Sequence, residues 1–495
     1  MRLFKFKGGV HPEGNKGATH CAIEQLPLPA RLYVPLQQHI GAPATPVVKA
    51  GDKVLKGQLI AQSQGAVSAA VHAPSSGTIV DIAEHQAPHP SGLPVECIII
   101  ATDGKEQWID LDVPKEPFHL SEKEIARRIS DAGIVGLGGA TFPSALKFNL
   151  GLKQRVETLV INGAECEPFL TSDDRLMQER TQKIVEGIRI MALGLNAQQT
   201  IIAVEDNKPL AVHAMTAACE SYNDTNVLTV PTRYPMGSEK HLVFTVTGKE
   251  IPAGKLAADI GVMVHNAATA YAVYDAIYEG RPLVSRIVTV AGDAIRQPRN
   301  LEVLFGTLAS ELIDYCNGFE QEPARLLMGG PLMGLVIPNV NVPIIKGSNG
   351  IIALSQKEVR MGEQSPCIRC SRCVSACPCG LMPLDMAANI KAGNFDRAED
   401  YGINDCISCG SCGYVCPANI PLVHFFNYAK GELKARAVAK QQQEYTSELA
   451  KQRQTRMEKI EKEKAAMAAR AAAAKKAREA AAKAKAEQEE KEATS

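Results

Sequence analysis

The feature that most constrains this chain is a cysteine pattern that occurs twice in its last third. Each copy has three cysteines spaced by two residues and then a fourth that precedes a proline. In proteins with two cubane clusters, the three spaced thiolates of one copy bind one cluster and the fourth cysteine binds the other. The pattern therefore predicts two 4Fe-4S clusters, one held by Cys367, Cys370, Cys373 and Cys416, the other by Cys406, Cys409, Cys412 and Cys377.

Two other uses of these cysteines fit the pattern less well. Structural zinc also binds Cys-x-x-Cys pairs, but it takes four ligands and leaves the third cysteine of each copy unexplained. A disulfide framework belongs to small secreted chains, whereas nine of the 14 cysteines here cluster between Cys367 and Cys416 of a 495-residue chain. We expect Cys379 to be a bystander and the five scattered cysteines to be buried thiols.

Composition limits the partners of the chain. Lys plus Arg and Asp plus Glu are both 54, so no overall basic field would attract nucleic acid. The first 14 residues lack the apolar stretch of a secretory signal. The most apolar longer stretch, residues 260–278, contains His265, Asn266 and Asp275, so we expect no transmembrane segment. These features predict a cytoplasmic protein without nucleic acid, whose association with a membrane is peripheral.

The pattern along the chain predicts a multidomain protein of α/β and β parts. Residues 1–115 contain two strand-and-turn units, Gly51–Ala61 and Val71–Ile79, of the kind found in barrel-sandwich (lipoyl-like) domains. Their hairpin tip, Ser68–Val71, lacks the lysine that lipoyl carriers modify, so a structural or docking role is expected. The further boundaries that we predict are an α/β domain at 116–283, a β-grasp-like domain at 284–350, a ferredoxin-like cluster domain at 355–430 and an Ala/Lys/Glu-rich tail at 431–495.

Within the second domain, strands alternate with helices. Ser121 and Glu124 have the capping-box pattern of a helix start. Strands are expected at 158–162, 200–204 and 227–230, and helices at 176–193 and 210–219, which indicates a mostly parallel, Rossmann-like sheet with ligand loops at the carboxyl ends of its strands. In the third domain we expect a helix at 301–315. The tail has high helix propensity but little apolar surface, so it is helical or disordered.

A glycine-rich stretch, residues 133–147, lies at the start of the α/β domain. Its glycines allow close approach of a phosphate, and Pro143 suits the first turn of a helix whose N-terminus can bind an anion. Thr141 stands where the usual dinucleotide fingerprint has its third glycine. The stretch therefore predicts a nucleotide site that differs from the common one.

The stretch resembles the Gly-Arg-Gly-Gly-Ala-Gly-Phe-Pro segment of the flavin- and NADH-binding subunit of respiratory complex I, although Leu137 replaces the arginine. Residues 162–168, Asn-Gly-Ala-Glu-Cys-Glu-Pro, are similar to a second motif of that family, and residues 234–240 match a third loosely. The resemblance implies that FMN and NADH bind at Gly136, Gly138, Gly139, Ala140, Phe142, Lys147, Asn162, Glu165, Glu167, Gly237 and Glu239. Lys147 and Glu165 are the candidate catalytic residues; otherwise Lys147 is a surface lysine and the two glutamates belong to a hydrated loop.

The complete domain order resembles the C subunit of the Rnf electron-transport complex. This resemblance implies a peripheral subunit on the cytoplasmic face of the inner membrane, associated with membrane subunits of the same complex and with a ferredoxin-type redox partner. The complex would couple electron transfer between NADH and ferredoxin to ion transport. A flavin is required because a nicotinamide exchanges two electrons as hydride, whereas each cluster accepts one. The alternatives are a soluble NADH diaphorase subunit and an electron-relay or docking subunit without a working flavin site.

Overall fold

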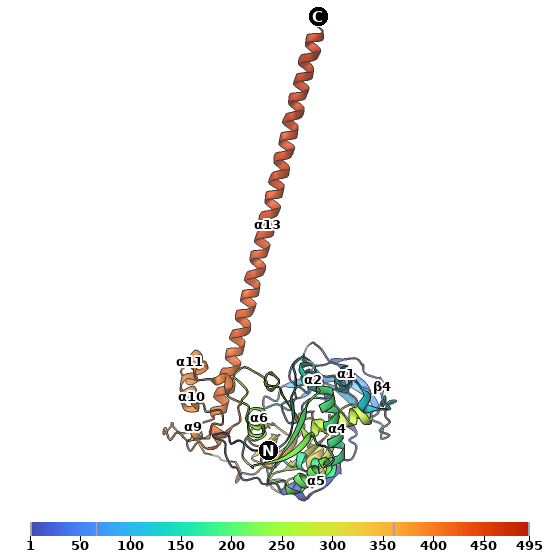
Figure 1. Ribbon diagram of the computed structural model, residues 1–495, viewed down its shortest axis with the longest axis vertical. Helices are drawn as coiled ribbons and strands as arrows, with labels where there is room; N and C mark the ends of the chain where they lie inside the picture. The colour runs from blue at the N-terminus through green and yellow to red at the C-terminus, as the bar shows by residue number, and fades with distance from the viewer. Residues whose placement is uncertain (1, 66, 152, 360–361, 494–495) are drawn as a thin grey trace. The chain divides into compact units, whose positions relative to one another are not determined.

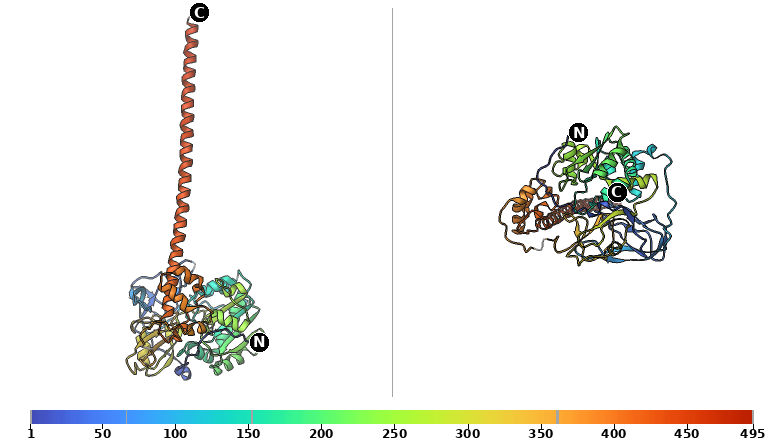
Figure 2. Two further views of the ribbon diagram at one scale, coloured as in Figure 1. Left: turned by 90° about the vertical axis from the view of Figure 1, so that its left-hand side faces the viewer. Right: turned by 90° about the horizontal axis from the view of Figure 1, so that it is seen from below.

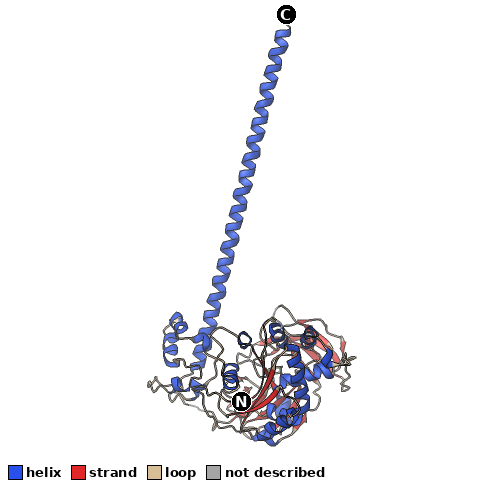
Figure 3. Ribbon diagram, in the orientation of Figure 1, coloured by secondary structure: helices blue, strands red, loops and turns tan. Residues whose placement is uncertain are grey.

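The computed structural model describes residues 2–65, 67–151, 153–359 and 362–493. The chain divides into two units, residues 1–426 and 427–495. The described residues of the first unit form four β-sheets and most of the helices (Figures 1 and 3). The second consists of the continuation of one helix, α13 (Leu422–Glu492), so the alanine-rich tail that we expected to be helical or disordered is helical through Glu492.

Two small antiparallel sheets form the barrel-sandwich domain. The first has the order β2-β8-β7-β4 and the second the order β3-β5-β6. Their strands are β2 (Arg31–Pro35), β3 (Thr45–Pro46), β4 (Lys53–Val54), β5 (Leu59–Gln62), β6 (Val71–His72), β7 (Gly77–Gln86) and β8 (Pro94–Thr102). Alternate residues face a shared core that includes Leu32, Ile60 and Ile98. The hairpin tip is buried at Ala69 and Ala70, which agrees with a structural role for this domain.

The second domain is a four-stranded parallel sheet with the order β11-β10-β9-β12. Its strands are β9 (Thr158–Gly163), β10 (Gln199–Glu205), β11 (Thr225–Val230) and β12 (Val262–Asn266). The central strands β9 and β10 are almost completely buried, as parallel strands covered on both faces must be. All four strands end at the same edge, where Asn162, Glu205 and Asn266 lie, so the polar loops expected from the sequence meet there.

Helices cover this sheet (Figure 1). They are α1 (Glu122–Asp131), α2 (Ser144–Gly151), α3 (Ser172–Glu179), α4 (Thr181–Leu195), α5 (Pro209–Cys219), α6 (Glu239–Thr247) and α7 (Ala267–Tyr278), with short 3-10 turns η2 (Pro117–His119) and η3 (Ala257–Ile260). The Ser121 side chain caps α1 by accepting a hydrogen bond from Glu124 N, as the sequence predicted. The single helix expected at 176–193 is instead two helices, because the backbone leaves the helical conformation at Arg180.

The third domain is a mixed six-stranded sheet with the order β1-β14-β13-β17-β15-β16. Its elements are β1 (Ile23–Gln25), β13 (Ser285–Ala291), β14 (Arg299–Leu304), α8 (Ala309–Tyr315), β15 (Arg325–Met328), β16 (Leu335–Val336) and β17 (Gly350–Leu354). The helix expected at 301–315 was too long, since its first residues pair with β13 in strand β14. Strand β1 was grouped with the barrel-sandwich domain by position, but it pairs with β14 of this sheet.

The cysteine-rich region is built from short helices joined by tight turns. They are α9 (Arg372–Ala376), α10 (Pro383–Lys391), α11 (Phe395–Asp400), η4 (Ile403–Asp405) and α12 (Ser411–Tyr414). Helices α9 and α12 begin within the two cysteine motifs and pack together. The N-terminus lies beside the α/β domain, as both views in Figure 2 show, and the segment that follows it packs on this domain through Phe6 and ends in η1 (Gly17–His20).

Candidate functional site

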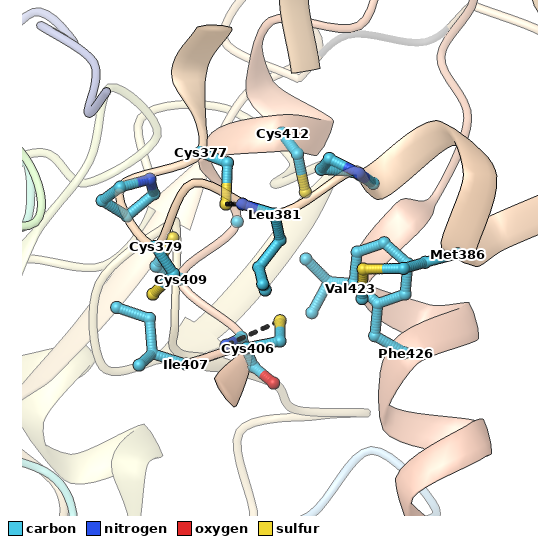
Figure 4. A pocket seen from close by; sticks show the side chains of 14 residues that line it. Cys377, Cys379, Leu381, Met386, Cys406, Ile407, Cys409, Cys412, Val423 and Phe426 are labelled. Carbon is cyan, nitrogen blue, oxygen red and sulfur yellow. Dashed lines mark hydrogen bonds between the residues drawn. The ribbon is translucent and has the colours of Figure 1, made fainter. Parts of the chain in front are cut away.

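Two pockets in the first unit are lined by the eight cysteines of the repeated motif. The inner cysteine pocket is lined by Cys377, Cys406, Cys409 and Cys412, together with Cys379 (Figure 4). The outer cysteine pocket, with a volume of about 190 Å³, is lined by Cys367, Cys370, Cys373 and Cys416. Each pocket thus combines three cysteines of one motif with the fourth cysteine of the other, which is the crossed arrangement that the spacing predicted.

Backbone N–H groups around these cysteines favour the negatively charged thiolate form that binds metal. Amide N–H groups donate to three of the sulfurs, Arg369 N to Cys367 Sγ, Ser408 N to Cys406 Sγ and Leu381 N to Cys377 Sγ, each at 3.4 Å. Such donors stabilise thiolates and tune cluster potentials. No three His, Cys, Asp or Glu side chains among the described residues converge as they would around a single metal ion. The donor set fits a cubane cluster in each pocket, and Cys379, expected to be a bystander, lies on the wall of the inner one.

The glycine-rich stretch forms a closed loop between β-bridge partners Val135 and Pro143. Gly136 N donates to Phe142 O at 2.8 Å, which closes the loop. Gly138 lies against Asn266 at the end of β12, where an added Cβ would be 3.3 Å from the asparagine Cβ. Gly139 has φ of +104°, a conformation that favours glycine. Gly136, Gly138, Gly139, Ala140 and Phe142 are therefore held at the edge where β9 and β12 end.

A buried hydroxyl and a helix start follow this loop directly. Ser144 opens helix α2, and its Oγ is buried without a hydrogen-bond partner among the described residues. An unpartnered buried hydroxyl costs free energy unless a ligand satisfies it. Ser144 N and Leu146 N already donate to Ile134 O at 3.0 Å and Pro143 O at 3.2 Å, so the hydroxyl is a group at this helix start that is left for the phosphate of a flavin nucleotide. The residues present therefore fit FMN.

Lys147 and Asn162 connect three of the predicted segments. The Lys147 ammonium donates to Glu239 Oε2 at 3.1 Å and to Val264 O at 2.8 Å. The Asn162 amide donates to Gly237 O at 2.9 Å. These contacts bring together Lys147, Asn162, Gly237 and Glu239 at the strand ends. The Lys147 side chain is 24% exposed and is held by two polar partners, so the alternative of a simply solvated surface lysine does not describe it.

The two glutamates of the second motif have different partners. Glu165 has φ of +49°, and its carboxylate accepts hydrogen bonds from Asp173 N, Asp174 N and Ser172 Oγ at the start of α3. A carboxylate at a helix N-terminus is stabilised by the free N–H groups and the helix dipole. The Glu165 side chain therefore fixes the loop between β9 and α3, and its role as a catalytic residue stays a prediction.

The Glu167 carboxylate faces another loop. It accepts hydrogen bonds from Leu332 N at 3.0 Å and Met333 N at 2.8 Å, in the loop that follows β15. Burial raises the pKa of Glu167 to about 7, although these two N–H groups oppose the shift. This contact joins the α/β domain to the third domain. We expected Glu167 to line the flavin pocket, but in this structure both of its carboxylate oxygens bond to the loop that follows β15.

Two buried lysines bond to the backbone of the second motif, residues 162–168, and of the residues that follow it. Lys208 Nζ donates to Ala164 O at 2.7 Å and forms a buried ion pair with Glu205 at 2.9 Å. Burial alone would lower the pKa of Lys208, but the charges of Glu205 and Glu165 outweigh it and raise the pKa. Lys16, from the N-terminal segment, donates to the carbonyl oxygens of Glu165, Glu167 and Leu170 at 2.5–2.9 Å. Sequence reasoning missed both lysines, because a lysine that bonds to backbone carbonyls has no motif.

The third flavin-type loop contacts the inner cysteine pocket. The Tyr234 hydroxyl donates to Cys409 O at 2.6 Å, and a His241 ring nitrogen lies 3.1 Å from Pro378 O. Tyr234 and Cys409 share a buried apolar cluster with Val10 and Ala376. The segment that carries Gly237 and the start of α6 is therefore in direct contact with the wall of the inner pocket, a contact that no motif in the sequence indicated.

Comparisons with known proteins agree with the three parts of this arrangement. Residues 4–105 match the RnfC barrel sandwich hybrid domain, residues 129–275 the Nuo51 FMN-binding domain, and residues 366–420 a 4Fe-4S dicluster domain. The C subunit of the ion-translocating oxidoreductase complex of Rhodobacter capsulatus is 52% identical over 444 residues, covering 89% of this chain and 86% of the relative. The chain belongs to the RnfC family, the C subunits of ion-translocating oxidoreductase complexes.

A second member of the RnfC family is similar over nearly its whole length. The C subunit of the proton-translocating ferredoxin:NAD(+) oxidoreductase complex of Clostridium ljungdahlii is 42% identical and is covered to 95%, with 88% of this chain. Family membership confirms the predicted barrel-sandwich, FMN-binding and two-cluster iron–sulfur domains. None of the helices that the structure describes combines the length and the hydrophobicity of a membrane span.

Proposed function

We propose that this chain is the peripheral NADH-linked subunit of an ion-translocating complex, in which electrons pass between the flavin site and a partner through the inner and then the outer cysteine pocket. The observation that carries the proposal is the 2.6 Å hydrogen bond from Tyr234 to Cys409 O, which joins the flavin-type loop to the inner pocket. A bound flavin converts the two electrons of a hydride into the single electrons that clusters accept.

The chain's own residues have distinct parts in this proposal. The eight motif cysteines supply the two cluster ligand sets, and the amides of residues 369, 381 and 408 stabilise their thiolates. Gly138, Gly139 and Lys147 bind and orient the flavin nucleotide at the strand ends. The relative from Clostridium ljungdahlii is named a ferredoxin:NAD(+) oxidoreductase subunit, which supports a nicotinamide as the two-electron partner here.

The two pockets differ in exposure in a way that supports their order. Two cysteines of each pocket are buried, but the other two of the outer pocket, Cys367 and Cys370, are exposed, whereas those of the inner pocket, Cys377 and Cys406, are half-buried. Electron transfer to another protein requires a cluster near the surface, so the outer pocket suits the exchange with a redox partner. We propose that this partner is a membrane subunit of the same complex or a ferredoxin-type protein, and that the chain is attached to the cytoplasmic face of the inner membrane.

Anaerobic titration with NADH tests the proposal. The flavin- and cluster-loaded chain is followed by visible absorbance for the flavin and by EPR for reduced clusters. We expect NADH to bleach the flavin and to reduce both clusters in the wild-type chain, and the Lys147→Met variant to bind flavin more weakly. Clusters that are present but are not reduced by NADH would contradict the proposal and favour an electron-relay subunit. Release of the native chain into the soluble fraction without a membrane wash would favour a diaphorase.

A further inference from the structure

We infer that the N-terminal strap, defined as residues 3–16, is a positioning element of the redox junction that fixes the flavin loops against the inner cysteine pocket. The inference rests on the proposed function, because it assigns the strap a part in transfer between these two sites. By its position the strap was grouped with the barrel-sandwich domain. Its contacts connect three other segments instead: the flavin-type loop at 234–237, the motif at 162–170 and the first cysteine motif.

The strap begins on the α/β domain. Phe4 N donates to Thr245 O at 2.9 Å, and Phe6 packs edge-on to His241 with ring centroids 4.8 Å apart. Phe6 is buried in the core cluster behind β9 and β10. The guanidinium of Arg233 lies over the Phe6 ring at 4.8 Å and donates to Phe6 O. This end of the strap is therefore anchored to the domain that carries the flavin loops.

The middle of the strap touches the inner pocket and the flavin-type loop at once. Gly9 N donates to Ala376 O at 2.9 Å, one residue before the cluster ligand Cys377. Val10 and Tyr234 exchange two backbone hydrogen bonds of 2.8 and 3.0 Å. Because Tyr234 in turn donates to Cys409 O, the strap closes a ring of contacts around the junction.

Gly8 shows how tightly the strap fits. It has φ of +67°, and an added Cβ would lie 2.3 Å from Cys377 O and 2.6 Å from Cys377 C. Real Cβ atoms do not approach a backbone carbonyl so closely, so a side chain here must displace either the strap or the Cys377 backbone. Only glycine satisfies both the conformation and the space.

The far end of the strap holds the second flavin motif. The Lys16 ammonium donates to three carbonyl oxygens between residues 165 and 170, and Phe169 N donates to Gly14 O at 2.8 Å. Three donors on one side chain fix a loop that has unusual backbone conformations at Glu165 and Phe169. Such fixation matters because small displacements of reacting groups can lower rates by up to about 100-fold where geometry controls the reaction.

Two strap variants and one matched control test the inference in the full-length, cofactor-loaded chain. Gly8→Ala perturbs the contact with Cys377, and Lys16→Met removes the three donors while keeping an unbranched side chain. The control is Gly17→Ala, since an added Cβ at Gly17 has no atom within 4 Å. Flavin content, iron content and thermal stability are measured first, so that the comparison is made between variants with equal cofactor loading.

The first readout does not depend on NADH. The clusters are reduced chemically, and their EPR spectra and midpoint potentials are recorded. We expect Gly8→Ala to change the spectrum or potential of one cluster and to leave the other unchanged, whereas Gly17→Ala changes neither. The second readout is the rate at which clusters become reduced after rapid mixing with NADH, compared with the rate of flavin bleaching. Both strap variants should slow cluster reduction by about tenfold or more, and Lys16→Arg, which retains donors, should recover part of the rate.

Two results would overturn the inference about the strap. Unchanged EPR spectra and transfer rates in Gly8→Ala and Lys16→Met would overturn the inference and leave the strap as packing alone. Equal effects of Gly8→Ala and Gly17→Ala would overturn it as well. If Gly8→Ala does not fold, Lys16→Met and its arginine counterpart carry the test. Should the wild-type flavin fail to react with NADH, the proposed function fails, whereas the chemically reduced EPR spectra still test the strap.

Discussion

Replacement of Lys208 by methionine tests the buried charge network under the flavin motif. Lys208 and Glu205 form an ion pair whose side chains are 2% and 0% exposed. Lys208 Nζ also donates to Ala164 O at 2.7 Å and Asn207 Oδ1 at 2.9 Å. One Glu205 oxygen is already without a partner among the described residues. Lys208→Met would therefore leave the Glu205 carboxylate buried without its hydrogen-bonded ion-pair partner.

The magnitude follows from that geometry. Removal of one partner of a buried, hydrogen-bonded ion pair costs about 3–5 kcal/mol. Since each 1.4 kcal/mol is a factor of ten, amide exchange in β9 and β10 should speed up between about 100-fold and about 4,000-fold if these strands open as one unit. The double variant Lys208→Met/Glu205→Leu should recover about 2 kcal/mol of the lost free energy of unfolding. It removes the unpaired Glu205 carboxylate but still leaves Ala164 O without a donor.

Hydrogen exchange followed by mass spectrometry measures this effect on peptides that cover residues 158–166 and 199–208. The matched control is Lys249→Met, which breaks the ion pair between Lys249 and Glu157 in the same domain. This pair has a similar length, 3.0 Å, but both of its side chains are about half exposed. An exposed pair contributes at most about 1 kcal/mol. Equal exchange rates in Lys208→Met and Lys249→Met, or a double variant less protected than the single one, would refute the reasoning.

Two further predictions concern the clusters and pH. Cys416→Ser and Cys373→Ser, although they lie in different motifs, should both lose the same cluster, with iron falling from about eight to about four atoms per chain by elemental analysis; loss of different clusters would contradict the crossed ligand sets. Burial lowers the pKa of Lys346 to about 7, so the folded chain binds fewer protons than the unfolded chain between pH 7 and the ordinary lysine pKa. The free energy of unfolding of the wild type, relative to that of Lys346→Met, should therefore increase with pH from about 7 to about 10. Chemical denaturation at several pH values measures this difference. A difference that does not change with pH would show that the amine is not desolvated.

The sequence was most informative where chemistry requires a fixed spacing. The crossed cysteine sets followed from the two motifs, because three thiolates at intervals of three residues fit one cubane cluster. The glycine loop was also recognisable, since Gly139 has a positive φ that favours glycine and Gly138 lies close against Asn266. The parallel sheet followed from alternating apolar strands and amphipathic helices, and the capping of α1 from Ser121 and Glu124.

Contacts between distant segments could not be predicted in this way. Strand β1 joins β14 almost 280 residues away, and nothing in its three residues specifies that partner. Lys16 and Lys208 look like ordinary surface lysines in the sequence, yet both bond to backbone carbonyls of the flavin motif. The bonds from Glu167 to Leu332 and Met333 were hidden for the same reason, because its partners are main-chain N–H groups of another domain.

Rapid-mixing EPR on two cysteine variants tests the central claim most directly, which is that electrons from the flavin site reach the inner cysteine pocket before the outer one. Cys377→Ser removes a ligand of the inner pocket and Cys416→Ser removes one of the outer pocket. After mixing with NADH, we predict that Cys416→Ser reduces its remaining cluster at the wild-type rate, whereas Cys377→Ser bleaches its flavin but leaves its remaining cluster oxidised on the same timescale. Rapid reduction of the outer cluster in Cys377→Ser would contradict the account.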